Sequence, residues 1–311
     1  MKRSTFLVTA ILPLLLTVSV CAQVSRSVAV TFDDLPATGG TSTLKRLRYI
    51  NSNLLAKLSD DNVPAIGFVN EGKLMVEGEI DDRTALLAEW LDRGHLLGNH
   101  TFSHIAIDNA TFEHYREDLI RGETVTRMLL ERRGLKLKYY RHTQLRTGPN
   151  EVYRKQLSDL LRDRGYSVAP VTIDNNEYVF AAVYNDAVSK GDTQLADRIA
   201  EAYIGYMSSV FSHFEGLSRD FLGYEVPQVL LLHANELNAD RFDELAEMMR
   251  GRGYRFITLD EALKDKAYTL PEAGSTRGLS WIHRWILAAG QETREEPDVP
   301  GWISDLFRRR G

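Results

Sequence analysis

Two adjacent carboxylates, Asp33 and Asp34, follow the apolar run Val28–Phe32. Adjacent carboxylates repel each other and lose solvation on burial, so they need a metal cation or an arginine nearby. The alternative is a turn or helix cap, because Pro36 and two glycines follow closely. The aspartate pair alone leaves both interpretations open.

Two histidines, His100 and His104, follow another apolar run and are separated by three residues. This spacing places both rings on one face of a helical turn, which directs two imidazoles at one metal ion. One aspartate of the first pair would complete a set of two histidines and one carboxylate. Such a set leaves coordination positions open for water or substrate, as a catalytic metal site requires.

Other polar residues also follow apolar runs. His233 follows the run Gln228–Leu232, Arg141 follows Leu137–Tyr140, and Glu177 lies just beyond the run 167–173. A histidine at the end of a fully apolar strand is costly without a partner, so we expect a functional role for His233.

Short β-rich runs alternate with longer amphipathic runs along the chain. This alternation predicts parallel strands joined by right-handed crossovers, and seven candidate strands favour closure into a barrel. Functional residues should then lie beyond the C-terminal ends of strands. The expected strands are 28–32, 65–69, 95–98, 137–140, 167–173, 228–232 and 255–258, and the expected helices include 43–59, 82–93, 112–133, 150–164, 193–211 and 240–250.

The motifs together resemble those of the polysaccharide deacetylases, the NodB-homology group in carbohydrate esterase family 4. The run Thr31-Phe32-Asp33-Asp34, the pair His100 and His104, and the run Leu230–His233 are similar to motifs one, two and five, in the family's order. The resemblance extends from about residue 28 to about residue 268. It implies an α/β fold, a distorted NodB-like (β/α) barrel of about seven parallel strands with a C-terminal helical extension.

The resemblance also implies an activity, the metal-dependent removal of N-acetyl groups from amino sugars of a polysaccharide or oligosaccharide. Asp34, His100 and His104 would bind the divalent metal, most simply zinc, with cobalt or nickel as alternatives. The metal would polarise the acetyl carbonyl and activate water. Asp33 would be the general base, and His233 would be the general acid that protonates the departing amine.

Two motifs differ from the family pattern. In motif three, Arg141 is kept and would orient the general base, whereas Thr143 stands where the family has proline. In motif four, Glu177 and Tyr178 stand where the family has Asp-Trp, and Glu177 would hold the His233 ring and favour its charged form. We expect these differences to affect substrate choice and rate more than metal binding.

The first 23 residues are typical of a secretory signal. Basic residues, the apolar run Phe6–Val20 and small residues before Gln23 predict cleavage after Ala22. The apolar run is shorter than the ~20 residues of a membrane-spanning helix. The single cysteine, Cys21, would leave with the signal, which excludes disulfides and a thiol nucleophile from the mature chain. We therefore expect a secreted or periplasmic protein.

The chain has 311 residues and a net charge of −5, which gives no indication of nucleic-acid binding. We expect a signal peptide over residues 1–22, a catalytic domain over residues 23–273 and a tryptophan-bearing extension over residues 274–311. Trp281 and Trp285 have helical spacing and predict a packing stripe on the barrel, with stacking on a sugar as the alternative. The sequence does not predict an oligomeric state.

Three other functions remain open at this point. A non-haem iron oxygenase uses the same ligand types, although Asp34 precedes the histidines by a long segment. A carbohydrate-binding relic that keeps the metal, or a hydrolase of another carbon–nitrogen bond, is also compatible with the motifs. Of the remaining histidines, His142 is a further functional candidate because it follows Arg141, whereas the others are expected to be structural or solvated: His95, His114, His213 and His283.

Overall fold

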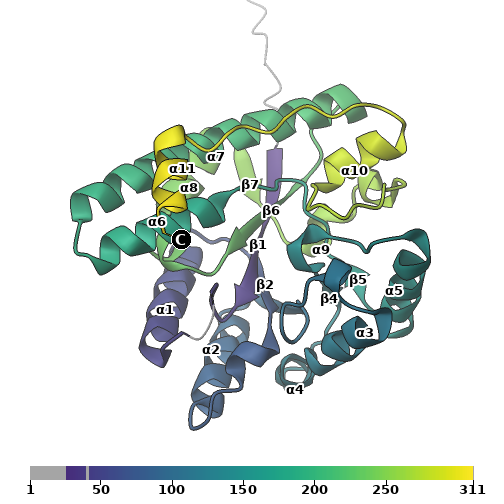
Figure 1. Ribbon diagram of the computed structural model, residues 1–311, viewed down its shortest axis with the longest axis horizontal. Coiled ribbons are helices and arrows are strands. Elements are labelled where there is room, and N and C mark those ends of the chain that lie inside the picture. Colours follow the sequence, from purple (N-terminus) through teal and green to yellow (C-terminus); the bar gives the residue numbers. More distant parts are fainter. Residues whose placement is uncertain (1–25, 40–41, 311) are drawn as a thin grey trace, which may run out of the picture.

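A computed structural model describes residues 26–39 and 42–310, and the predicted signal peptide lies outside these residues. The described chain contains a seven-stranded parallel sheet surrounded by helices (Figure 1). The strands are β1 (Arg26–Leu35), β2 (Ala65–Val69), β3 (Leu96–Asn99), β4 (Tyr139–Tyr140), β5 (Ser167–Val168), β6 (Gln228–His233) and β7 (Tyr254–Phe256).

The strands curl into a distorted barrel. Their order is β5-β4-β3-β2-β1-β6, and β7 pairs with the start of β1. The chain after β5 returns to the other edge of the sheet, where Ile173 bridges Leu230 and the amide of Thr172 donates to the Val229 carbonyl. Residues 167–173 thus connect the two edges, and the predicted α/β barrel is confirmed.

Two apolar cores lie on the two sides of the strands. Along β1, Val28, Val30 and Phe32 pack outward against the helices, whereas Ala29 packs into the barrel. Because β2 and the centre of β6 are buried on both faces, Ala65–Val69 and Val229–Leu232 are continuous apolar runs. The barrel interior is filled by Ala29, Ile66, Phe68, Tyr139, Ala169, Val229, Ile257, Leu259 and Ala262.

Helices cover the outside of the barrel, except for the short helix Leu259–Ala262, which contributes to the barrel interior. One predicted helix, residues 112–133, is wrong as a single element, because the chain breaks at Gly122, where a Cβ would lie 2.5 Å from the backbone carbon of Thr101. His213 lies inside a long helix rather than near its end. The helices are α1 (Leu44–Asp60), α2 (Ile80–Asp92), α3 (Phe112–Arg121), α4 (Thr124–Glu131), α5 (Glu151–Asp163), α6 (Glu177–Ser189), α7 (Thr193–Leu222), α8 (Glu236–Gly251), α9 (Leu259–Ala262), α10 (Trp281–Ala288) and α11 (Gly301–Arg308).

The C-terminal part is helical and packs on the barrel domain. Helix α10 contacts α7, and α11 contacts α6. Trp281 and Trp285 are buried, as the packing stripe predicts, and the Trp281 amide donates to the Val171 carbonyl. The proposed boundary between residues 273 and 274 stays a prediction. Within the described residues, none of the helices combines the length and hydrophobicity needed to cross a membrane.

Candidate active site

Strand β1 ends in the two carboxylates, Asp33 and Asp34. Consecutive residues of a regular strand point to opposite faces, but the pairing of β1 with β2 shifts register between Phe32 and Leu35. Asp34 also has a left-handed backbone, with φ of 72°. Such a conformation is costly for a non-glycine residue and is typical of functional sites. The distortion brings both carboxylates to the same end of the barrel.

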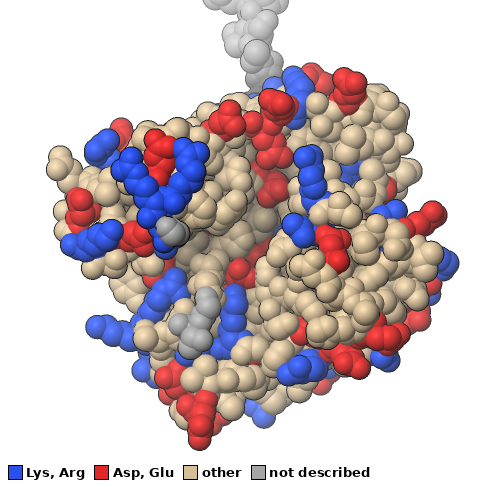
Figure 2. All heavy atoms as spheres, viewed as in Figure 1, with Lys and Arg blue, Asp and Glu red and all other residues tan. Residues whose placement is uncertain are grey.

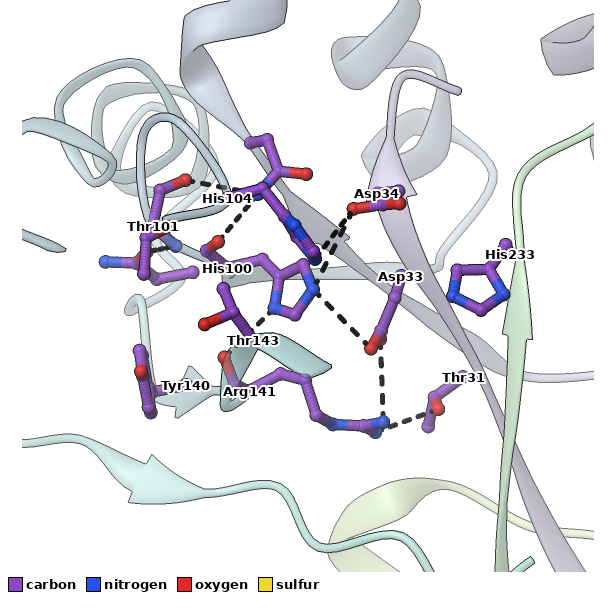
Figure 3. A network of polar contacts seen from close by, with 12 residues as sticks. Thr31, Asp33, Asp34, His100, Thr101, His104, Tyr140, Arg141, Thr143 and His233 are labelled. Atoms are coloured by element: carbon purple, nitrogen blue, oxygen red, sulfur yellow. Dashed lines mark hydrogen bonds and ion pairs between the residues drawn. The ribbon is translucent and has the colours of Figure 1, made fainter. Parts of the chain in front are cut away.

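His100 and His104 approach Asp34 from the loop after β3 (Figure 3). Their Nε2 atoms lie 3.9 and 3.5 Å from Asp34 Oδ1, and the two ring centroids are 5.0 Å apart. One candidate ligand atom from each of the three residues lies within 4.8 Å of the others. The structure therefore brings together the three residues predicted to bind metal.

The predicted helical turn around the two histidines is wrong. The segment is an irregular loop in which Thr101 and His104 have left-handed backbones, with φ of 66° and 57°. Side chains from outside the loop hold it, because Asn99 accepts from the Thr101 amide and Asp118 accepts from the Ser103 amide and hydroxyl. The rings converge through this loop geometry rather than through helical spacing.

The chemistry of these three side chains fits a divalent cation. His100 Nδ1 donates to the Arg141 carbonyl at 3.0 Å, so its Nε2 carries the lone pair that faces Asp34. Burial lowers the pKa of His100 and of His104 to about 4, so both are neutral at pH 7, as metal ligands must be. Burial alone would raise the pKa of Asp34, but the nearby Lys73 and histidines hold it well below its usual range. Asp34 Oδ1 is buried without a hydrogen-bond partner.

Asp33 lies between the histidine pair and His233 (Figure 3). Arg141 Nη1 lies 3.5 Å from Asp33 Oδ1, and Arg141 Nη2 donates to the Thr31 hydroxyl at 2.9 Å. The fully buried guanidinium also lies over the Phe68 ring, 4.6 Å from its centroid. Burial raises the pKa of Asp33, against the opposing effect of Arg141. The carboxylate of Asp33 is thus held by Arg141, and burial makes it more basic.

His233 stands opposite Asp33 in the pairing of β1 with β6. Its Nδ1 is 2.8 Å from Glu177 Oε2, and Glu177 is fully buried at the start of α6. The other carboxylate oxygen accepts from Asn235 and Asn238. Burial alone would lower the pKa of His233, but the hydrogen bond and charge of Glu177 raise it to about 9. His233 is therefore protonated at neutral pH, with Nε2 free of the Glu177 contact.

Sequence reasoning missed a supporting segment directly after β2. Asn70 donates to the His100 carbonyl at 2.6 Å, the Gly72 amide donates to the Phe102 carbonyl at 2.8 Å, and Lys73 contacts Asp34. These residues follow the apolar strand Ala65–Val69, so the rule of polar residues after strands could have found them. Asn235 and Asn238 follow β6 and could have been found in the same way.

Asp174 is a further carboxylate near these groups. It follows the bridge that joins residue 173 to β6, and its pKa is affected by the charges of His233, Arg141 and Asp33. Burial is the main cause that raises the pKa of Asp174 to about 6. Asp174 directly follows the expected strand 167–173, so the rule of polar residues after strands could have found it.

Several other predicted residues lie away from the candidate catalytic groups. His142 is buried and stacks on Trp281, with ring centroids 6.2 Å apart, so its surroundings are those of a packing residue. Tyr178 is 51% exposed and packs edge-on against Phe307 of α11. The Thr143 hydroxyl donates to a loop carbonyl at Ile105. His95 and His283 are buried and His114 is exposed, as expected.

A cleft opens beside the histidine pair. It has a volume of about 580 Å³ and is lined by Asp34, Lys73, Met75, Phe102 and His104, among others. Figure 2 shows that this face of the molecule is hollowed at its centre, with acidic atoms on the floor of the hollow. Two of the candidate metal ligands, Asp34 and His104, are therefore accessible from a cleft of a size that suits a small ligand.

Comparison with known proteins identifies a family for part of this chain. Residues 22–169 match the polysaccharide deacetylase family, so the predicted resemblance is confirmed. The match contains Asp33, Asp34, His100, His104 and Arg141, and it ends before Glu177 and His233. No curated protein sequence matches the chain.

Similar solved structures include three proteins of related description. The peptidoglycan deacetylase PdaC from Bacillus subtilis is 18% identical, with a TM-score of 0.48 over 77% of this chain and 92% of that chain. A family 4 carbohydrate esterase from Streptomyces lividans, in complex with acetate, is 16% identical, with a TM-score of 0.48 over 77% and 96%. A family 4 carbohydrate esterase from Bacillus anthracis is 18% identical, with a TM-score of 0.47 over 77% and 83%.

Proposed function

We propose that this polysaccharide deacetylase-like chain is a metal-dependent hydrolase that removes N-acetyl groups from amino sugars of a polysaccharide or oligosaccharide. The observation that carries the proposal is the position of Asp33. It lies 3.7 Å from His100 Nε2 and opposite His233 in the sheet, between three candidate metal ligands and a protonated imidazole. A base and an acid on two sides of one reaction centre are what amide hydrolysis requires.

Asp34, His100 and His104 would hold the cation, most simply zinc. When bound, the cation supplies Lewis-acid polarisation of the acetyl carbonyl and lowers the pKa of water. Asp33 would accept the proton from the attacking water, because its carboxylate is oriented by Arg141 and stays basic through burial. His233 would donate a proton to the departing amine from Nε2, because Glu177 holds Nδ1 and keeps the ring charged.

The roles of the two carboxylates follow from their different surroundings. Asp34 faces two imidazoles and an ammonium group, all of which favour its ionised form. Asp33 faces one guanidinium across 3.5 Å and is only 3% exposed. Neighbouring carboxylates with pKa values pushed in opposite directions are typical of a site in which one serves as ligand and the other as base.

The test is acetate release from a panel of N-acetylated oligosaccharides, with chelator-treated protein and with protein reloaded with zinc, cobalt or nickel. We expect metal-dependent release that also proceeds without dioxygen. Release that survives complete metal removal would contradict the mechanism, and a requirement for dioxygen would favour an oxygenase instead. Metal binding without release from any sugar would favour the carbohydrate-binding relic, or a hydrolase of another carbon–nitrogen bond.

We also propose that residues 1–22 are a secretory signal and that the mature enzyme acts outside the cytoplasm. The support is the sequence pattern of residues 1–23. Expression of the full chain in a bacterial host, followed by mass spectrometry of the exported protein, should give a mature N-terminus at Gln23. Retention of the intact chain in the cytoplasm would contradict the proposal.

A further inference from the structure

Lys73 is a largely buried lysine at the wall of the active-site cleft. Its side chain is 21% exposed and belongs to the short helical turn Glu71–Leu74 after β2. The ammonium donates to the Asp34 carbonyl at 3.0 Å and to the Ala37 carbonyl at 3.1 Å. It also lies 3.5 Å from Asp34 Oδ1. The ammonium group thus makes two hydrogen bonds and one ion pair to the turn that carries a candidate metal ligand.

These contacts hold Asp34, whose backbone conformation is costly. Asp34 has a left-handed backbone, which a non-glycine residue keeps only when its surroundings enforce it. Lys73 holds both the main-chain carbonyl and the carboxylate of Asp34, so it restrains the backbone and the side chain together. No carboxylate other than that of Asp34 forms an ion pair with Lys73 among the described residues.

Lys73 is itself held in place by its own main chain. Its amide donates to the Asn70 carbonyl at 3.0 Å, and its carbonyl accepts from Arg83 at 2.8 Å. Arg83 is buried and pairs with Glu79 at 2.7 Å. The backbone that carries the lysine side chain is therefore held in place by contacts of its own.

We propose that Lys73 is a positioning residue that orders Asp34 for metal binding. This inference rests on the proposed function, because it assumes that Asp34 is a metal ligand. Hydrogen-bond partners of metal ligands orient those ligands, and their loss typically weakens metal binding about 10- to 100-fold. Lys73→Met removes the positive charge and the hydrogen-bond donors while keeping a similar chain length. Lys73→Arg keeps the charge and the donors.

The experiment measures metal binding in the absence of substrate. The zinc dissociation constant of the purified mature protein is determined by competition with a chromogenic chelator, and the visible absorption of the cobalt-loaded protein reports the coordination geometry. We expect Lys73→Met to raise the zinc dissociation constant about 10- to 100-fold and to change the cobalt spectrum. Lys73→Arg should recover part of the affinity, and circular dichroism should show all variants folded.

Lys57→Met is the matched control. Lys57 lies on α1 and pairs with Asp243 of α8 at 2.7 Å. The Lys57→Met substitution therefore also removes a lysine ion pair, but one that lies away from the site. The zinc affinity of the Lys57→Met protein should equal that of the wild type. Lys73→Met with wild-type or tighter zinc binding and an unchanged cobalt spectrum would overturn the inference alone. Wild-type protein that binds neither zinc nor cobalt would overturn the proposed function as well.

Discussion

The contact between Glu177 and His233 makes a prediction about pH dependence. The pKa of His233 is raised to about 9 because Glu177 accepts from Nδ1 at 2.8 Å and is fully buried. Glu177→Gln removes the negative charge and keeps the size of the side chain. Burial then lowers the pKa of His233 while the charges of Asp34 and Asp33 still raise it, so we expect the pKa to fall toward the ordinary 6.5.

The size of the effect follows from these two values. At pH 8, a group with a pKa of about 9 is about nine-tenths protonated, whereas one with a pKa of about 6.5 is only about 3% protonated. A general acid must be protonated, so kcat/KM at pH 8 should fall about 30-fold through this effect alone. The alkaline limb of the kcat/KM profile should move from about pH 9 toward pH 6.5.

The same shift predicts a pH-dependent stability. Because the pKa of folded His233 lies above the ordinary value, its protonation stabilises the fold fully below about pH 6.5, and this contribution is lost as pH rises through about 9. The difference between the two pKa values corresponds to ~3 kcal/mol. Wild type should therefore lose part of its free energy of unfolding across this range, whereas Glu177→Gln should not.

Two variants serve as controls for this prediction. Glu177→Asp keeps the negative charge, so the alkaline limb of its kcat/KM profile should stay near that of the wild type. Glu215→Gln removes another buried carboxylate, which pairs with Arg252 at 2.8 Å away from the site. It should reduce stability without moving the profile. An active Glu177→Gln enzyme with the wild-type alkaline limb would refute the assignment of His233 as the acid held by Glu177.

Three further predictions concern the proposed base, the contact of Thr31 with Arg141 and the packing of the histidine loop. Asp33→Asn should lower kcat by about 10²- to 10⁴-fold while zinc binding, measured by equilibrium dialysis, is retained; loss of zinc binding would instead indicate that Asp33 is a ligand. Thr31→Val removes the hydroxyl that accepts from Arg141, so the free energy of unfolding in urea should fall by about 1.5–3 kcal/mol; an unchanged value would contradict this contact. Gly72→Ala places a Cβ 2.6 Å from a carbonyl oxygen of the histidine loop and should cost about 1–3 kcal/mol, whereas Gly251→Ala meets no atom within 4 Å and should not; equal denaturation midpoints would refute the close packing.

Much of the fold could be predicted because parallel strands buried on both faces leave a strong trace in the sequence. The runs 65–69 and 229–232 are apolar throughout, and both lie in strands of the sheet. The polar residues after them could then be assigned to one end of the barrel. The break at Gly122 could not be predicted, because it depends on close packing against Thr101, which is distant in sequence.

The geometry of the histidine pair also lay beyond sequence reasoning. The i, i+4 spacing predicts a helical turn, but the loop amides donate to the side chains of Asn99 and Asp118, and Thr101 and His104 adopt left-handed conformations. Spacing can therefore identify the residues that converge while giving the wrong path of the chain between them. The same limit applies to Lys73, whose partners Asp34 and Ala37 come from another loop.

Arg141 shows how a strand of only two residues, β4, can connect the two halves of the site. Its side chain lies 3.5 Å from Asp33, the proposed base, while its carbonyl accepts from Nδ1 of His100, a proposed ligand. The position of the base and the orientation of the ligand therefore depend on the same backbone. Because the guanidinium is buried against Phe68 and Thr31, the barrel interior itself fixes this geometry.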